Sequence, residues 1–218
     1  MLIHSAAGGV GIAATRIAKP IGAKVVATAS AAKHGALPAL GMDELIDYRP
    51  EDFEKRARDV TDGRGDERIL DAVGSASPNK GQRLLAPTGR LGIFSLSCAA
   101  TNQTGGYLVM IAALARTPWL QFTPLSLMNA NKGVFGVNLG HIWGEVDRLR
   151  RWMDAITVLW TEGAIKPQIA RALPFDEASA AHHFIQNRKS LGKVLLTLDH
   201  LGANSAGCRR SHLERDRM

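Results

Sequence analysis

The sequence predicts an α/β protein with a doubly wound parallel sheet, which is a sheet with helices on both faces. Three observations carry this prediction: a glycine-rich segment directly follows an apolar stub, short β-branched runs alternate with helical stretches, and glycine or proline stands at the boundaries. Of the 218 residues, 45% are hydrophobic and 22% are charged. These values argue against a disordered chain, a collagen or a coiled coil.

The first elements form a strand, turn, helix and strand. The apolar stub at 2–4 runs into the glycine-rich turn at 5–11. Small residues at helical spacing follow from 12 to 21, although Pro20 lowers the stability of this helix unless the helix ends early. The β-branched run at 24–29 predicts a second, buried strand, which lies parallel to the first.

The alternation continues to residue 137. Further strands are predicted at 44–47, 68–73, 90–94 and 132–137, and further helices at 32–40, 50–60, 78–85 and 108–115. Asp52 is expected on the solvated face of its helix. Pro87 and Gly89 are expected to separate the helix at 78–85 from the strand that follows it.

A different pattern begins after Gly140. Apolar residues recur at intervals of three, four and seven from Val146 to Trp160, which predicts a long amphipathic helix. A strand, a helix and a second strand are expected next, at 169–175, 176–187 and 192–198. Asp176 is the expected N-cap of that helix. The polar, Arg-rich stretch from 200 to 218 is expected to be disordered.

Charge and cysteine content argue against several kinds of partner. The formal net charge is +7, but no basic block is interleaved with aromatic residues, so we expect no nucleic-acid partner. Cys98 and Cys208 are too few for a disulfide framework or a zinc cluster, and we expect no bound metal. No apolar run is long enough to span a bilayer and the N-terminus lacks a signal-peptide pattern, so we expect a cytoplasmic protein without a membrane partner.

The glycine-rich turn is the strongest local motif. Ala6, Gly8 and Gly11 occupy the three positions of a dinucleotide-binding turn, where a tight bend, a close approach to pyrophosphate and close helix packing require small residues. Backbone amides at the helix N-terminus would hold the phosphates. Such a turn can also be only a tight turn, but its place between a strand and a helix favours the binding function.

The end of the second strand predicts which dinucleotide is bound. An acidic residue there holds the ribose of NAD, but residues 28–34 contain none. Ser30 offers a hydroxyl donor and Lys33 a cation that attracts a 2′-phosphate, so the sequence favours NADP(H). The alternative is that Lys33 is a surface lysine at a helix start. Tyr48 could contact the adenosine or the phosphate, or it could be a half-buried loop residue.

The remaining motifs carry little chemistry. The segments 71–74 and 93–96 end two strands, and their backbones are expected to line the nicotinamide side of the site. The pair His182-His183 points in two directions from one helix and is a poor metal site. No sequence pattern of a nucleophile elbow or a zinc protease occurs, so we name no catalytic residue.

Together, the segments 5–11, 46–49, 71–74 and 192–195 resemble the medium-chain dehydrogenase/reductase superfamily. The resemblance is to the zinc-independent NADPH:quinone oxidoreductases of the zeta-crystallin type. The segment 129–141 resembles the subgroup of synaptic vesicle membrane protein homologues. The resemblance extends from residue 2 to residue 198, and it implies a Rossmann domain followed by a C-terminal α/β return segment.

The resemblance also implies a set of cofactor-binding residues. Those implied for the pyrophosphate are Ala7, Gly8, Gly9 and Val10. Those implied for the 2′-phosphate and adenosine are Ser30, Lys33 and Tyr48. Those implied for the nicotinamide half are Ser75, Ile93, Phe94, Ser95, Leu96, Phe135, Gly136 and Val137.

The sequence departs from the family at its start. Family members begin with a GroES-like domain that carries most of the substrate pocket, and this sequence starts inside the first Rossmann strand. We therefore expect an NADP-binding domain at 1–139, a return segment of the truncated GroES-like domain at 140–199, and a tail at 200–218. The expected function is NADPH-dependent reduction of a quinone or α,β-unsaturated carbonyl; the alternative is a dinucleotide-binding module without turnover. A homodimer through the edge strand at 134–137 is implied by resemblance only.

Overall fold

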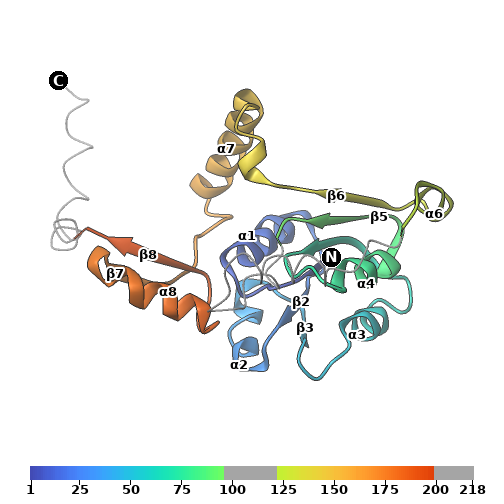
Figure 1. The fold of residues 1–218 in the computed structure, drawn as a ribbon, viewed down its shortest axis with the longest axis horizontal. Coiled ribbons are helices and arrows are strands. Elements are labelled where there is room, and N and C mark those ends of the chain that lie inside the picture. The colour runs from blue at the N-terminus through green and yellow to red at the C-terminus, as the bar shows by residue number, and fades with distance from the viewer. Residues whose placement is uncertain (96–121, 199–218) are drawn as a thin grey trace, which may run out of the picture. The chain divides into compact units, whose positions relative to one another are not determined.

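The computed structural model describes residues 1–95 and 122–198. Within them, the main feature is a six-stranded sheet with the strand order β3-β2-β1-β4-β5-β6 (Figure 1). Its strands are β1 (Leu2–Ile3), β2 (Val26–Ala29), β3 (Glu44–Asp47), β4 (Asp66–Asp71), β5 (Leu85–Ile93) and β6 (Gly133–Gly136). Every neighbouring pair is parallel, so the carboxyl ends of these strands share one edge of the sheet. The predicted fold class is confirmed.

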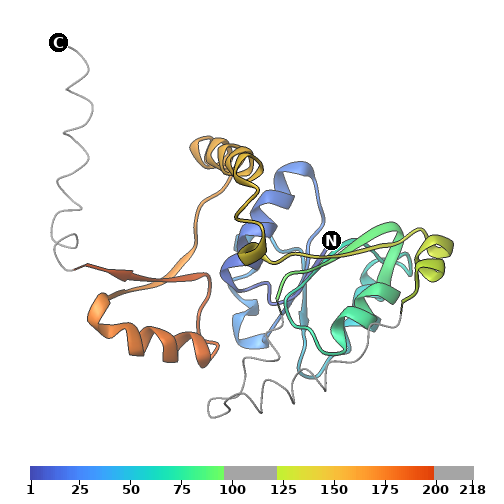
Figure 2. The same ribbon diagram turned by 45° about the horizontal axis from the view of Figure 1, so that its top comes forward.

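Helices connect the strands of this sheet. They are α1 (Gly9–Ala18), α2 (Ala31–His34), α3 (Phe53–Val60), α4 (Ser77–Leu84) and α6 (Pro124–Ala130), and α7 (Val146–Thr161) follows the strand β6. In both views, α3 and α4 lie together on one side of the sheet and α1 lies on the other (Figure 2). This arrangement follows from right-handed crossovers that run outward from β1 in both directions.

The core lies between the sheet and these helices. Its buried members come from five strands and two helices, and they are Leu2, Val26, Ile46, Ala57, Ile69, Leu84, Leu85 and Leu91. Burying one such aliphatic side chain contributes about 1.5–3 kcal/mol relative to leaving it in water. The short apolar runs of the sequence therefore stabilise the packing of the sheet against these helices.

Proline positions decide two element boundaries. The first helix ends at Ala18 and continues as a single 3₁₀ turn, Lys19–Ile21, that contains Pro20. The expected helix at 32–40 is wrong as one element: it is α2 followed by a separate 3₁₀ turn, Pro38–Leu40. Pro38 cannot donate the amide hydrogen bond that a continuous helix would need, so the chain starts a new turn there.

The boundary before the fifth strand was also wrong. β5 begins at Leu85 and runs through Pro87 and Gly89, which were expected to separate it from α4. Leu85 pairs with Asp66, but the next pair is Arg90 with Arg68, so β5 carries extra residues at this point. An irregularity of this kind accommodates a proline that cannot donate to the ladder.

Two helix starts differ from the expectation as well. Asp52 is exposed as expected, but it is the N-cap of α3, where it accepts a hydrogen bond from the amide of Glu54, and not a residue within the helix. The helix α6 was not expected, although Thr123 and Ser126 form a capping box there. The expected helix at 108–115, both cysteines and the tail at 200–218 lie outside the described residues.

A second compact unit begins at Pro167. It contains the strands β7 (Ile169–Pro174) and β8 (Lys193–Thr197), which are parallel, with α8 (Ala178–Gln186) between them. Asp176 is not the N-cap of α8: it lies in a 3₁₀ turn, Phe175–Glu177, and Glu177 takes that position without a side-chain cap. The predicted domain boundary at 139/140 remains a prediction. Among the described residues, no helix is long and apolar enough to cross a membrane.

Candidate functional site

The glycine-rich turn lies where the strand order of the sheet reverses. From β1 the chain builds outward to β2 and β3 on one side, and then to β4, β5 and β6 on the other. In open parallel sheets of this order, ligands bind outside the carboxyl ends of the strands at the reversal. The turn after β1 and the start of α1 therefore form the centre of the candidate site.

Two glycines give this turn its shape. Gly8 is the N-cap of α1, and its amide donates to the carbonyl oxygen of Ser5 at 2.9 Å. A Cβ on Gly11 would lie 2.5 Å from the Cα of Ala6, so only glycine allows α1 to approach the turn this closely. The amides of Gly9, Val10 and Gly11 precede the first helical hydrogen bond, which Ile12 donates to Gly8, and the helix dipole favours negative charge there. The residues present therefore fit a pyrophosphate group.

The four residues predicted to hold the pyrophosphate are contiguous in this turn. Ala7 is buried, Gly8 and Gly9 are half-buried, and Val10 is exposed. Three of the four are alanine or glycine, so no long side chain covers the backbone at these positions. Their role in binding remains a prediction.

The residues predicted to contact the 2′-phosphate follow two neighbouring strands. Ser30 follows β2 and is the N-cap of α2, in which Lys33 is the third residue. Tyr48 follows β3 and is 40% exposed. Ala29 and Asp47 are register partners at the ends of these strands, so both turns leave the sheet at the same edge.

Asp47, which sequence reasoning did not single out, joins these two turns. Its Oδ2 accepts a hydrogen bond from the amide of Ala31 at 3.2 Å, and its Oδ1 accepts one from the amide of Arg49 at 3.1 Å. Its own amide donates to Oε1 of Glu51 at 2.7 Å. The only signal in the sequence is the position of an acidic residue at the end of a predicted strand.

A second carboxylate shapes the turn after β4. Asp71 is fully buried, and its Oδ1 accepts hydrogen bonds from the amides of Val73 at 2.7 Å and Gly74 at 3.1 Å. Its Oδ2 accepts from the hydroxyl of Ser77 at 2.6 Å. Gly74 and Ser75 both have positive φ angles, of 76° and 56°. The predicted nicotinamide-side residue Ser75 therefore lies in a left-handed turn that Asp71 holds in place.

The end of β5 lies beside this turn. The amide of Phe94 donates to the carbonyl oxygen of Asp71 at 3.0 Å, which extends the pairing of β4 and β5 by one residue. Ile93 and Phe94 are half-buried, and Ser95 is exposed. Leu96 lies outside the described residues. Three of the four predicted residues of this segment thus lie at the expected edge.

The end of β6 is paired with the end of β5. The amide of Val137 donates to the carbonyl oxygen of Ile93 at 2.8 Å. A Cβ on Gly92 would lie 2.8 Å from the ring of Phe135, so this ring packs directly on the backbone of the neighbouring strand. Phe135, Gly136 and Val137 are all exposed, so this end of the site is open among the described residues.

His4 lies buried directly after β1. Its Nδ1 lies 3.0 Å from the hydroxyl of Thr28, and its ring contacts the ring of Phe53 edge-on at 4.5 Å. Burial lowers the pKa of His4, and the negative charge of Asp71 opposes that shift. The buried imidazole therefore contacts β2 through Thr28 and α3 through Phe53, and sequence reasoning did not single it out.

The described residues contain no group of three or more His, Cys, Asp or Glu side chains placed to hold a metal ion. His182 and His183 are consecutive residues of α8, and Cys98 and Cys208 lie outside the described residues. Four such ligands in tetrahedral geometry are needed for a structural zinc ion. The side chains of the described residues therefore do not fit a structural zinc ion.

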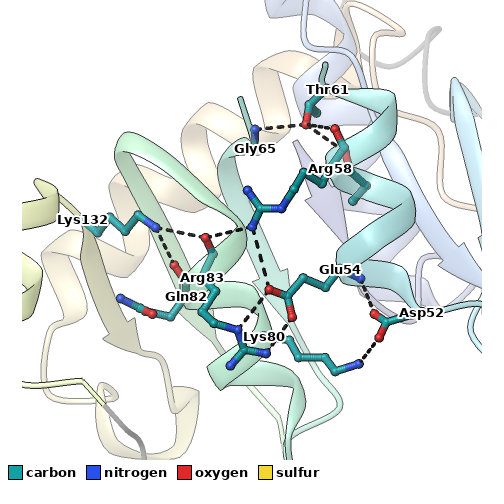
Figure 3. Close-up of polar contacts among 10 residues, drawn as sticks. Asp52, Glu54, Arg58, Thr61, Gly65, Lys80, Gln82, Arg83 and Lys132 are labelled. Atoms are coloured by element: carbon teal, nitrogen blue, oxygen red, sulfur yellow. Dashed lines mark hydrogen bonds and ion pairs between the residues drawn. The ribbon is translucent and has the colours of Figure 1, made fainter. Parts of the chain in front are cut away.

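A polar network on α3 and α4 contains none of the predicted site residues (Figure 3). Glu54 accepts two hydrogen bonds from the guanidinium of Arg83, at 3.0 and 2.6 Å. Lys80 donates to Asp52 at 2.8 Å, and Lys132 donates to two carbonyl oxygens in the last turn of α4 at 3.0 and 3.1 Å. These cations face carboxylates or carbonyl oxygens, so the network joins α3, α4 and the start of β6.

The parallel sheet, its strand order and the glycine-rich turn at the reversal define a protein of the Rossmann-fold class. A family model described as zinc-binding dehydrogenase matches residues 40–196. The chain therefore belongs to this family, within the medium-chain dehydrogenase/reductase superfamily, and it is similar to the VAT-1 homologues of that superfamily. The resemblance stated from the sequence is confirmed.

Three similar proteins illustrate the relationship. The human synaptic vesicle membrane protein VAT-1 homolog is 36% identical over 199 residues, which are 90% of this chain and 49% of that protein. A quinone oxidoreductase of Pseudomonas syringae pv. tomato is 28% identical, with a TM-score of 0.67 over 89% of this chain and 55% of its own. A mycobacterial protein in complex with NADPH is 27% identical, with a TM-score of 0.70 over 90% of this chain and 56% of its own. The chain spans about half the length of the relatives that it matches.

Proposed function

We propose that this chain is the cofactor-binding part of an NADPH-dependent oxidoreductase whose acceptor is a quinone or an α,β-unsaturated carbonyl compound. The observation that carries the proposal is the glycine-rich turn at the start of α1, where Gly11 packs against Ala6 at the reversal of the strand order. Two similar proteins support it, one described as a quinone oxidoreductase and one solved with NADPH.

In this proposal the chain binds and orients the cofactor, and the dihydronicotinamide supplies the hydride when it is bound. The backbone amides at the start of α1 hold the pyrophosphate, and the side chains after β2 and β3 hold the adenosine phosphate. The nicotinamide half lies against residues at the ends of β4, β5 and β6, namely Ser75, Ile93, Phe94, Ser95, Phe135, Gly136 and Val137. These residues position the ring and exclude water from one of its faces.

The preference for NADPH over NADH tests the cofactor. No carboxylate directly follows β2, and Lys33 and Ser30 stand there instead. A charge-assisted contact to the 2′-phosphate is worth about 1.5–3 kcal/mol, so NADPH should bind about ten- to a hundredfold more tightly than NADH. Titrations of both nucleotides by nicotinamide fluorescence measure this ratio. Equal affinities, or an unchanged ratio in Lys33→Glu, would contradict the proposal.

A second candidate function is dinucleotide binding without turnover. It is favoured by the exposure of Phe135 and Val137, which are 48% and 40% exposed at the nicotinamide end. A hydride acceptor must be held close to the ring and aligned with it, and an open site holds nothing in place. The purified 218-residue chain should then bind NADPH yet oxidise it with quinones or enones at close to the background rate. A turnover number near the common enzyme median of about 10 s⁻¹ would reject this second candidate.

A further inference from the structure

One carboxylate connects the two turns that are proposed to recognise the adenosine phosphate. Ala29 and Asp47 end β2 and β3 as register partners, so the two turns begin side by side. Oδ2 of Asp47 accepts from the amide of Ala31, the first residue of α2, and Oδ1 accepts from the amide of Arg49 in the turn after β3. Each oxygen holds one turn, so a single rigid group sets the separation between them.

Asp47 is itself fixed on the sheet. Its amide donates to Oε1 of Glu51 at 2.7 Å, and its carbonyl oxygen accepts from the amide of Glu51 at 3.1 Å. The side chain therefore extends from a backbone that is held by the β-ladder on one side and by Glu51 on the other. A side chain that is fixed in this way holds the two turns at a constant separation, and a precise binding site requires such support.

The two turns carry the groups that distinguish the two cofactors. Ser30 follows β2 as the N-cap of α2, Lys33 is the third residue of α2, and Tyr48 lies on the turn after β3. NADH lacks the 2′-phosphate, so a change in the separation of the two turns should weaken NADPH binding more than NADH binding. A charge-assisted hydrogen bond weakens steeply when donor and acceptor are displaced.

We propose that Asp47 is a positioning residue that fixes the turn of Ser30 and Lys33 against the turn of Tyr48, and that it thereby sets the preference for NADPH over NADH. This inference rests on the proposed function, because it needs a cofactor site at these turns. In this proposal Asp47 does not contact the phosphate: its two oxygens accept hydrogen bonds from backbone amides, and a carboxylate repels a phosphate. It acts on specificity through the residues that it holds.

The test compares two ends of the same strand. Asp47→Ala removes both accepting oxygens, and Asp47→Asn keeps one accepting oxygen and removes the charge. The matched control is Asp43→Ala, since Asp43 precedes β3 at the opposite edge of the sheet, where it accepts from the amide of Val25 at 2.7 Å and from Lys19 at 2.8 Å. Calorimetric titration of the full 218-residue chain with NADPH and with NADH gives both dissociation constants for each variant.

We expect Asp47→Ala to weaken NADPH binding by about tenfold and NADH binding by less than about twofold, with Asp47→Asn in between. Asp43→Ala should lower the melting temperature and leave the ratio of the two affinities unchanged. Amide hydrogen exchange at Ala31 and Arg49 should speed up in Asp47→Ala and not in Asp43→Ala, because only the first variant removes their acceptors.

Three results would overturn the inference. An equal loss of both nucleotides in Asp47→Ala would mean that Asp47 only stabilises the fold. Tighter NADPH binding in Asp47→Ala and Asp47→Asn would mean that its charge repels the phosphate. A wild-type chain without any NADPH preference would reject the proposed cofactor and this inference with it. The failures are distinguishable, because the last one is seen in the wild-type titration alone.

Discussion

Two regions of the chain have regular apolar patterns but differ in burial. Ile3, Ile46 and Ile69, in three strands of the sheet, are fully buried. The helix α7 has an apolar stripe at helical spacing, yet none of its residues is buried. Trp152 and Trp160 on that stripe are 49% and 59% exposed.

The comparison separates the periodicity of an element, which the sequence shows, from its burial, which the tertiary structure decides. Periodicity determines which side of an element is apolar, whereas burial requires a second apolar surface opposite that side. Neighbouring strands and helices supply this surface to the sheet. None of the described residues covers the stripe of α7 to the same degree. The free energy of unfolding should therefore depend on the sheet residues far more than on the apolar residues of α7.

The largest expected effect is a cavity in the sheet. Ile69→Ala removes a fully buried side chain from β4 and should lower the free energy of unfolding by about 2–5 kcal/mol. The matched change on α7 is Ile156→Ala, at a residue that is 41% exposed, and it should cost less than about 1 kcal/mol. Urea unfolding measures both. Similar losses for the two variants would show that α7 is covered in solution.

A smaller effect is expected at the glycine-rich turn. In Gly11→Ala the new Cβ meets three backbone atoms of Ala6 at 2.5–2.8 Å, so the turn or α1 must shift, which should cost about 1–3 kcal/mol. Nucleotide binding should weaken as well, because the amides at the start of α1 move. The control is Gly144→Ala, before α7, where an added Cβ meets nothing within 4 Å. An equally stable Gly11→Ala would mean that the close approach is absent.

Acidic residues at the starts of α3 and α7 should differ by less in their effect on stability, since Asp52 is an N-cap and Asp147 lies in the first turn of its helix. Asp52 caps α3 by accepting from the amide of Glu54 at 2.9 Å, and Asp52→Ala should destabilise the protein by about 1 kcal/mol. On α7, Asp147 makes an exposed contact with Arg150 at 3.4 Å, and Asp147→Ala should change stability by less than about 0.5 kcal/mol. Thermal unfolding compares them. If Asp147→Ala lowered the stability more than Asp52→Ala, α7 would contribute more to stability than the region of the sheet, contrary to this comparison.

The last comparison concerns how steeply the free energy of unfolding changes with pH. Burial raises the pKa of Asp66 above its ordinary value of 3.8, against the lowering effect of the α-amino group of Met1 at 3.0 Å. Between the ordinary and the raised pKa, the folded state binds more protons than the unfolded state, so this carboxyl group destabilises the fold progressively as the pH rises through that window.

Asp66→Asn removes this dependence. The free energy of unfolding of the variant, minus that of the wild type, should therefore increase as the pH rises from about 4 toward neutrality. Urea midpoints at a series of pH values measure the difference. Asp147→Asn should retain the wild-type slope, because Asp66 is still present. A difference that falls with rising pH would show that the ion pair with Met1 outweighs burial.

Much of the sheet follows directly from the sequence. The short segments Val26–Ala29 and Glu44–Asp47 contain β-branched residues, and each forms a strand within the range expected for it. The glycine-rich turn was equally accessible, because its packing requirement is steric and local. Gly11 must lack a side chain in any structure that brings α1 this close to Ala6.

Other features depend on neighbours that are distant in the sequence. β5 begins five residues before Arg90 because Asp66 on β4 pairs with Leu85, and no local pattern announces that pairing. The hydrogen bonds of Asp47 to Ala31 and of His4 to Thr28 likewise join residues sixteen and twenty-four positions apart. The sequence shows that Asp47, His4 and Thr28 have polar side chains, but it does not show which atoms those side chains face.

The sequence by itself determined the fold class, the parallel alternation and the position of the glycine-rich turn, because these depend on residue size and on apolar spacing along the chain. The tertiary structure decided which apolar faces are buried and which carboxylates hold the turns at the sheet edge. The physical reason is that burial and hydrogen bonding are properties of pairs of surfaces. Asp47 acquires its role only when β2 and β3 pair and bring its side chain to the amide of Ala31, whereas Asp71 accepts from residues two to six positions further along the chain.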